Sequence, residues 1–384
     1  MDAQPLYDLT PILRLALLGA VIALGPLAWV WLRNRRASPS ARLRALTLLT
    51  LFLTFDLVVF GAFTRLSDSG LGCPDWPGCY GSASPLGARE EIHAEQSVRP
   101  SGPVTHGKAW VEMIHRYLAM TVGVLIIVMT VSSWVESRRG LAAVSPWWAT
   151  ATLAWVCAQG AFGALTVTLK LYPAIVTLHL LGGIGLLVLL VVQSELAAPK
   201  PMALAPGLRR LLHAVAGLAV LQVALGGWVS TNYAVLACQE FPTCQGSWWP
   251  PMDFRHGFTL LRELGETKQG DYLPFEALTA IHYTHRLMAY VVFAAMLLLA
   301  WRFQRSGGAA ARRASAALIA LAAWQLLSGL SNVVLGWPLV AALAHTAGAA
   351  ALITLLALWV ARAAPGRAEA CAGAPGALPP RAML

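Results

Sequence analysis

Two short segments with a histidine beside an arginine stand out in the sequence. Residues 112–116 read Glu-Met-Ile-His-Arg and open a long apolar run, and residues 282–286 read His-Tyr-Thr-His-Arg and open another. Residues three apart are neighbours on a helix, so Glu112 and His115 share a face. A carboxylate beside an imidazole suits proton transfer, and imidazoles in apolar surroundings suit metal binding.

Two further histidines lie at matched positions. Gln159 precedes His179 by 20 residues, and Gln325 precedes His345 by 20 residues. We interpret the glutamines as interhelical hydrogen-bond partners rather than ligands.

The cysteines repeat in the same way. Cys73 with Cys79 and Cys238 with Cys244 each enclose five residues, and each pair is followed by x-Gly-Ser-x-x-Pro. In an oxidising compartment each pair can form a structural disulfide, which we favour, or a redox-active dithiol. Matched loops and matched histidines indicate two homologous units.

Composition requires these units to lie in a membrane. Of 384 residues, 57% are hydrophobic and 12% are charged, which is more apolar surface than a soluble core can bury. Nine windows are long enough to span a bilayer. They are residues 11–32, 43–65, 110–135, 147–169, 174–196, 208–231, 276–301, 314–336 and 338–361.

The net charge of +10 follows from topology. Lysine and arginine concentrate in every second loop between the predicted spans, the pattern of cytoplasmic loops, so no nucleic-acid partner is implied. In a bacterial inner membrane, the N-terminus and both cysteine loops then face the periplasm and the C-terminus faces the cytoplasm.

The predicted fold is an all-α polytopic membrane protein. Two pseudosymmetric four-helix bundles form a parallel repeat, because four crossings return the chain to its starting side. One extra N-terminal transmembrane helix precedes them. The expected parts are residues 1–42 (extra helix and basic loop), 43–197 (N-terminal half), 198–207 (cytoplasmic linker), 208–362 (C-terminal half) and 363–384 (flexible cytoplasmic tail).

The four matched histidines are candidate axial ligands of haem iron. Two imidazoles at one depth in an apolar bundle provide both ligands, and hydrophobic walls fit the macrocycle. The pairs are His115 with His179 and His285 with His345. Arg116 and Arg286 are placed to pair with propionates. A structural histidine is the alternative at any one position, and zinc lacks a third or fourth ligand at that depth.

The two copies of the opening motif differ where the first has Glu112 and the second His282. A carboxylate near the iron can take up protons, whereas a histidine there suits holding a cofactor. We therefore expect the first half to react and the second to transfer electrons. Asp56, deep in a predicted span, is expected to pair with a polar group inside the bundle.

Residues 61–71 read Gly-Ala-Phe-Thr-Arg-Leu-Ser-Asp-Ser-Gly-Leu, and Cys-Pro-Asp-Trp-Pro and Glu-x-x-His-Arg follow. This combination resembles the haem A synthase family, whose signature is Gly-x-x-Thr-Arg-Leu-Thr-x-Ser-Gly-Leu. The resemblance covers residues 43–362. It implies an eight-helix bundle that oxidises the C8 methyl of haem O to a formyl group, giving haem A for terminal oxidases.

The resemblance also implies roles for the site residues. His115 and His179 would bracket the substrate haem, Glu112 would assist catalysis, and His285 with His345 would ligate haem b. Arg65 of the signature would join Arg116 and Arg286 in binding the cofactor, and the cysteine pairs resemble those of bacterial members. Departures are Ala62, Ser67, the extra first helix and an insertion at residues 257–271, to which we assign no function.

Expected partners are haem O synthase upstream, an electron-transfer partner, membrane lipid and a second copy of the chain. An alternative function is a quinol-linked membrane cytochrome b, which typically stacks two haems across the bilayer from one helix. A haem transporter ranks last, because it predicts similar polar residues on both sides and the inner side offers only His213.

Overall fold

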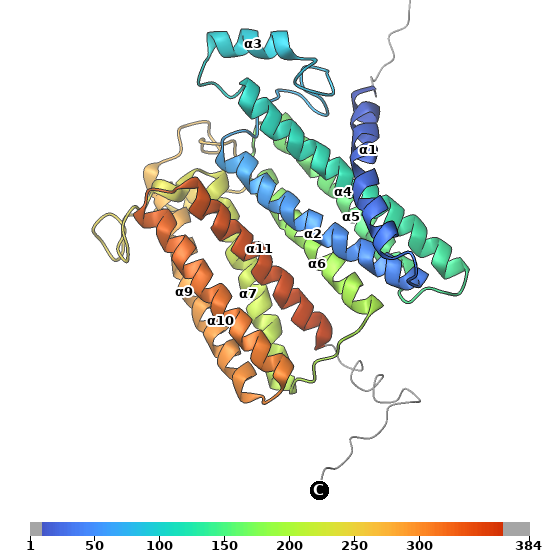
Figure 1. Cartoon of the computed structure of the whole chain (residues 1–384). Helices are drawn as coiled ribbons and strands as arrows, with labels where there is room; N and C mark the ends of the chain where they lie inside the picture. The colour runs from blue at the N-terminus through green and yellow to red at the C-terminus, as the bar shows by residue number, and fades with distance from the viewer. Residues whose placement is uncertain (1–9, 364–384) are drawn as a thin grey trace, which may run out of the picture.

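The computed structural model describes residues 10–363, and helices dominate this range. Nine helices within it are long and apolar enough to cross a membrane. They are α1 (Thr10–Arg33), α2 (Pro39–Leu66), α4 (His106–Arg138), α5 (Pro146–Thr168), α6 (Pro173–Ala197), α7 (Pro206–Thr231), α9 (Phe275–Arg305), α10 (Ala309–Val334) and α11 (Leu339–Arg362) (Figure 1). Each predicted span coincides with one of them, so the all-α polytopic class is confirmed. The predicted tail lies outside the described residues, apart from Ala363.

Local signals explain where the helices begin. The Ser38 side chain caps α2 by accepting a hydrogen bond from the Ala41 amide at 3.3 Å, and Thr105 caps α4 through the Lys108 amide at 3.3 Å. Proline opens α2, α5, α6 and α7, where its missing N–H costs nothing. Within a bilayer, helices are stable because their backbone N–H and C=O groups form hydrogen bonds inside the helix, where no water is available.

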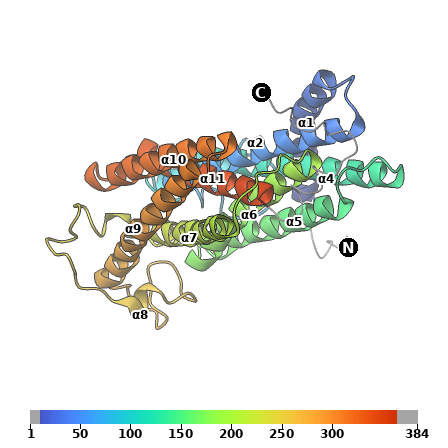
Figure 2. The same cartoon turned by 90° about the horizontal axis from the view of Figure 1, so that it is seen from below.

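The spanning helices pack in two groups that share a continuous interface. Helices α2, α4, α5 and α6 form one group, and α7, α9, α10 and α11 form the other. Helix α1 packs on α4 and α2 at the edge of the first group (Figure 2). The groups meet because α6 contacts both α7 and α11, and α2 contacts α11. The largest core cluster runs through α6, α7, α9, α10 and α11.

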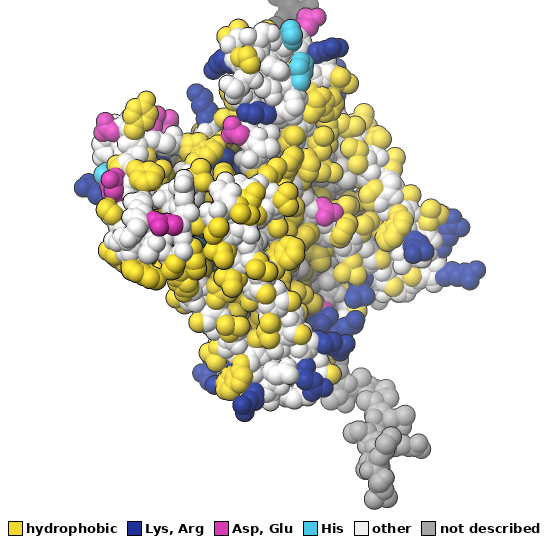
Figure 3. Space-filling model, turned by 60° about the vertical axis from the view of Figure 1, so that its left-hand side comes forward, with side chains coloured by type: hydrophobic (Ala, Val, Ile, Leu, Met, Phe, Trp, Pro, Cys, Tyr) yellow, Lys and Arg dark blue, Asp and Glu magenta, His cyan; other side chains and the backbone are white. Residues whose placement is uncertain are grey.

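The molecule has two chemically different ends. The cysteine-loop end holds both disulfide loops, together with α3 (Arg89–Val98), the 3₁₀ turn η1 (Ala234–Leu236) and α8 (Phe254–Gly257) (Figure 1). The basic end holds the loops that join α1 to α2, α4 to α5, α6 to α7 and α9 to α10. Figure 3 shows a hydrophobic belt between the ends. Helix α3 was not predicted, because it is polar and lies outside the apolar windows.

Candidate functional site

The four predicted histidines lie toward the cysteine-loop end of their helices. His179 and His345 are each the seventh residue of α6 and α11, His115 is the tenth of α4 and His285 the eleventh of α9. These positions correspond to about 9 to 15 Å from the helix start. All four side chains are half-buried. His115 lies within electrostatic range of His179, and His285 within range of His345, so the structure brings each pair together.

In the first group of helices, each histidine ring lies against a glycine of a neighbouring helix. A β-carbon on Gly61 of α2 would lie 2.9 Å from Nε2 of His115. One on Gly163 of α5 would lie 3.3 Å from Cε1 of His179. Ordinary carbon contacts are about 3.5 to 4.0 Å, so only glycine leaves these rings in place.

The second group has the same arrangement. A β-carbon on Gly226 of α7 would lie 3.0 Å from Cε1 of His285, and one on Gly329 of α10 would lie 3.0 Å from Cε1 of His345. Sequence reasoning missed these four glycines. The signal was present, since Gly61 and Gly226 are 165 residues apart, the offset of the two cysteine loops.

Neighbouring polar groups orient the rings of the second group. The side-chain amide of Gln222 lies 3.1 Å from Nδ1 of His285, and the Ser328 hydroxyl lies 3.0 Å from Nδ1 of His345. Gln325 donates to the His345 carbonyl at 3.0 Å, which confirms its predicted interhelical role. Metal-binding histidines commonly engage one ring nitrogen in this way, and the Gln222 amide also lies 3.5 Å from Nε2 of His285.

The first group holds its rings with fewer polar contacts. The Phe60 ring stacks on the His115 ring, with centroids 6.4 Å apart and planes at 11°. Nδ1 of His179 is buried without a hydrogen bond among the described residues. We call each glycine that lies against a histidine ring a glycine cradle. The two cradles of this group and the unpaired nitrogen of His179 fit a bound group that enters between the two rings. Each half therefore offers two imidazoles, enough for both axial positions of a haem iron.

Glu112 and Arg116 tie α4 to the first cysteine loop. The pair is buried, and Nη2 of Arg116 donates to Oε1 of Glu112 at 2.6 Å. Oε2 of Glu112 accepts the Cys73 N–H at 2.8 Å. Nη1 of Arg116 donates to the carbonyls of Asp75 at 3.0 Å and Pro77 at 3.1 Å, and also to that of Gly78. Glu112 thus lies one turn from His115 and also anchors the loop.

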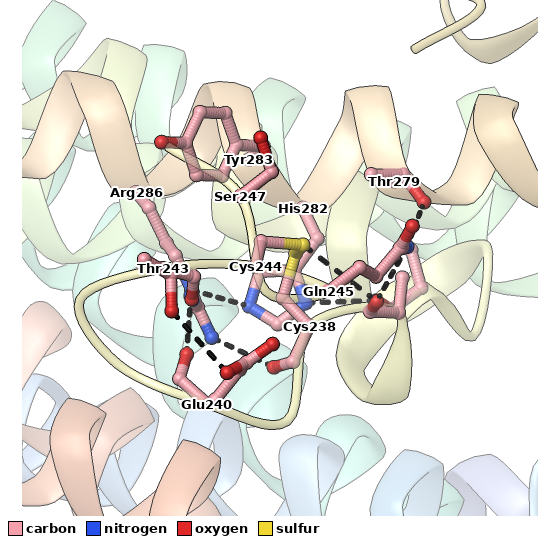
Figure 4. The surroundings of a disulfide bond; sticks show 12 residues. Cys238, Glu240, Thr243, Cys244, Gln245, Ser247, Thr279, His282, Tyr283 and Arg286 are labelled. Atoms are coloured by element: carbon pink, nitrogen blue, oxygen red, sulfur yellow. Dashed lines mark hydrogen bonds between the residues drawn. A yellow bond between two sulfur atoms is a disulfide. The ribbon is translucent and has the colours of Figure 1, made fainter. Parts of the chain in front are cut away.

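The second cysteine loop is held in the same manner (Figure 4). Arg286 donates to the carbonyls of Glu240 at 2.7 Å, Thr243 at 3.1 Å and Cys238 at 2.7 Å. Its Nε lies 3.2 Å from Nε2 of His282, whose Nδ1 lies 3.0 Å from the Ala234 carbonyl. Both ring nitrogens of His282 are therefore engaged by protein atoms. These contacts fix the loop, and a role for His282 in holding a cofactor stays a prediction beside them.

Both cysteine pairs form disulfides, Cys73–Cys79 and Cys238–Cys244. A carboxylate inside each loop, missed from the sequence, closes it further. Asp75 accepts the amides of Tyr80 at 2.6 Å and Gly81 at 2.7 Å, and Glu240 accepts the Gly246 amide. The two copies of the loop are therefore built on the same internal contacts. A propionate-binding role for Arg116 and Arg286 stays a prediction, beside their observed role in holding these loops.

Arg65 lies where the two helix groups meet at the cysteine-loop end. Its Nη2 donates to the Ser230 carbonyl at 2.7 Å, and its guanidinium lies 3.9 Å from the centre of the Tyr233 ring. The Tyr233 hydroxyl donates to Asp68 at 2.8 Å. Burial raises the pKa of Tyr233, and Asp68 acts in the same direction while Arg65 opposes it. Arg65 therefore joins the two halves, and its predicted contact with the cofactor stays a prediction.

Asp56 corrects one expectation. Its side chain is exposed on α2 and makes no hydrogen bond or ion pair among residues 10–363. The expectation rested on the position of Asp56 along the length of the helix. That position does not determine whether the side chain points into the bundle or out of it.

Comparison with known proteins agrees with this geometry. Residues 44–357 match the family COX15-CtaA, described as cytochrome oxidase assembly protein. A protein of Shewanella oneidensis named Heme A synthase is 36% identical over 312 residues, which cover 80% of this chain and 92% of that protein. A protein with the same name from a Methylobacterium species is 32% identical over 84% of this chain and 92% of its own length. Another, from Mesorhizobium japonicum, is 29% identical over 82% of this chain and 88% of its own length. The chain belongs to the COX15-CtaA family.

Proposed function

We propose that this chain is a haem A synthase, a membrane oxidoreductase that converts the C8 methyl of haem O to the formyl group of haem A. The name of its relatives supports this activity. The observation that carries the proposal is the duplicated site, with two histidines in each half and a glycine behind every ring.

The first half is proposed to hold the substrate haem O between His115 on α4 and His179 on α6. Glu112 lies one turn from His115 and is the only difference in charge between the two copies of the motif. Oxidation of a methyl group releases protons, and a carboxylate next to the site can accept them. Arg116 and the Cys73 amide orient this carboxylate, so its position depends on the first cysteine loop.

The second half is proposed to hold a resident haem b between His285 and His345. Bound haem supplies one-electron redox chemistry. Gln222 and Ser328 fix the ligand rings, and Arg286 with His282 holds the second loop without adding a carboxylate. Each ligand helix carries one matched histidine, near one end. This arrangement suits lateral transfer between two sites at one level rather than relay across the bilayer.

The proposed orientation places the cysteine-loop end in the periplasm and the basic end in the cytoplasm. The basic loops support it through the positive-inside pattern. Proposed partners are haem O synthase as the source of substrate, a separate electron-transfer protein and a second copy of the chain.

The experiment is pigment extraction from a bacterial strain that lacks this protein. We expect haem O to accumulate and haem A to disappear, and the wild-type chain to restore haem A. Glu112→Ala should leave haem O unconverted while the purified protein keeps haem b. Unchanged haem A in the deletion strain would overturn the proposal. Loss of haem b in Glu112→Ala with conversion retained would reverse the assignment of the two halves.

A further inference from the structure

A groove with a volume of 380 Å³ lies at the basic end of the second helix group, away from the four matched histidines. Its walls come from the beginning of α10, the end of α11 and the segment that joins α6 to α7. Three cationic side chains line it: Lys200, Arg313 and Arg362. The remainder of the lining is apolar.

One of the three cations, Arg362, is paired with a carboxylate, and the other two are not. Nε of Arg362 pairs with Oε2 of the buried Glu195 at 3.1 Å, and Oε1 of Glu195 accepts the Lys200 amide at 2.6 Å. The Met202 amide donates to the Arg362 carbonyl at 2.9 Å, which fixes the connecting segment beside α11. Lys200 and Arg313 are exposed and form no ion pair with a carboxylate in the described part of the chain. The groove therefore carries excess positive charge.

The apolar part of the groove is a trough along two helices. Ala314 and Ala317 of α10 form one side, and Leu355 and Trp359 of α11 form the other. The Trp359 ring is buried and packs edge-on against Phe303, with centroids 5.8 Å apart. Small residues on one helix and a fixed aromatic ring on the other leave room for a hydrocarbon chain. Figure 3 shows lysine and arginine side chains gathered at this end, next to the hydrophobic belt.

We propose that this groove binds an anionic phospholipid. Its phosphate pairs with Lys200 and Arg313 near Arg362, and an acyl chain lies along Ala314 and Ala317. Basic pockets between membrane helices recognise anionic headgroups in this way. The excess positive charge favours an anionic lipid over a zwitterionic one, whose own ammonium group would be repelled. A free phosphate would use the cations but leave the apolar trough unfilled.

The test measures binding of fluorescent phosphatidylglycerol and of fluorescent phosphatidylcholine to the full-length protein in detergent. We expect tighter binding of phosphatidylglycerol. Lys200→Gln and Arg313→Gln should each weaken it about fivefold, and the double variant about 25-fold, from the contribution of one cation near a membrane surface. Arg312→Gln is the matched control, because Arg312 neighbours Arg313 but contacts the Gly307 carbonyl and does not line the groove.

A second variant tests the trough without changing charge. Ala317→Trp should fill it and weaken phosphatidylglycerol binding, while inorganic phosphate should compete poorly with the lipid. Equal effects of Arg312→Gln and Arg313→Gln would overturn the proposal. Efficient competition by inorganic phosphate, with binding unchanged in Ala317→Trp, would show a free-phosphate site and would also overturn it. Thermal unfolding of each variant checks that the fold is retained.

Discussion

Gly226 provides a sharp test of the resident haem site. In Gly226→Ala the new β-carbon would lie 3.0 Å from Cε1 of His285, whereas carbon contacts settle at about 3.5 to 4.0 Å. The ring must therefore shift by about 0.5 to 1 Å, because the helix backbone cannot move away easily. Metal–ligand distances tolerate about 0.2 Å. We expect haem b affinity to fall about 10- to 100-fold, the usual cost of disturbing the groups that orient a ligand.

The assay is the haem b content of purified protein, with the absorption spectrum of the reduced form. Gly217→Ala is the matched control on the same helix, since a β-carbon there meets nothing within 4 Å. Alanine improves helix propensity by up to about 1 kcal/mol, so the control should be at least as stable as wild type. The contradicting result is that Gly226→Ala binds as much haem b as Gly217→Ala and has an unchanged spectrum. His285, whose ring lies against Gly226, would then not be a haem ligand.

Three further predictions concern the cysteine-loop end. Arg116→Met leaves the buried Glu112 without its cation and should destabilise the first cysteine loop by about 3 to 5 kcal/mol. The measurement is proteolysis of this loop, which should become faster. Unchanged proteolysis would refute the anchoring role of Arg116. The pKa of Tyr233 is raised in the folded protein, so the residue stabilises the fold at pH values below 10.0, the ordinary pKa of tyrosine. This contribution is lost as the pH rises through the pKa of the folded state. Tyr233→Phe should therefore flatten the decline in Tm above pH 10, and an identical decline would contradict the contact between halves. Cys238→Ser opens a short disulfide loop and should cost about 2 kcal/mol in thermal unfolding while haem b stays bound. Loss of haem b at intact stability would favour a redox role for that disulfide.

The sequence predicted the helices well because a membrane demands long apolar segments, and these are visible without any structure. It also located the four histidines, because the duplication placed them at matched offsets. The sequence did not show which protein atoms engage the ring nitrogens of His282. Its sequence position resembles that of a ligand, but its ring nitrogens are used by Arg286 and the Ala234 carbonyl.

The glycine cradles show where sequence reasoning lacked information. A glycine in an apolar helix has many packing uses, so Gly61 or Gly226 carries no meaning until a histidine is known to face it. The expectation for Asp56 was wrong for a related reason. In a uniformly apolar helix, the sequence has no periodicity that shows which face points into the bundle. Arg116 and Arg286 lie where expected, but only the folded loops show how many carbonyls each guanidinium contacts.

The most direct test of the central claim is haem binding by two single variants, His115→Ala and His285→Ala, purified from cells that supply haem O. We predict that His285→Ala loses the resident haem b, and that His115→Ala keeps it with a low-spin bis-histidine spectrum but forms no haem A. Retention of haem b in His285→Ala together with its loss in His115→Ala would contradict the assignment of one half to the substrate and the other to the cofactor.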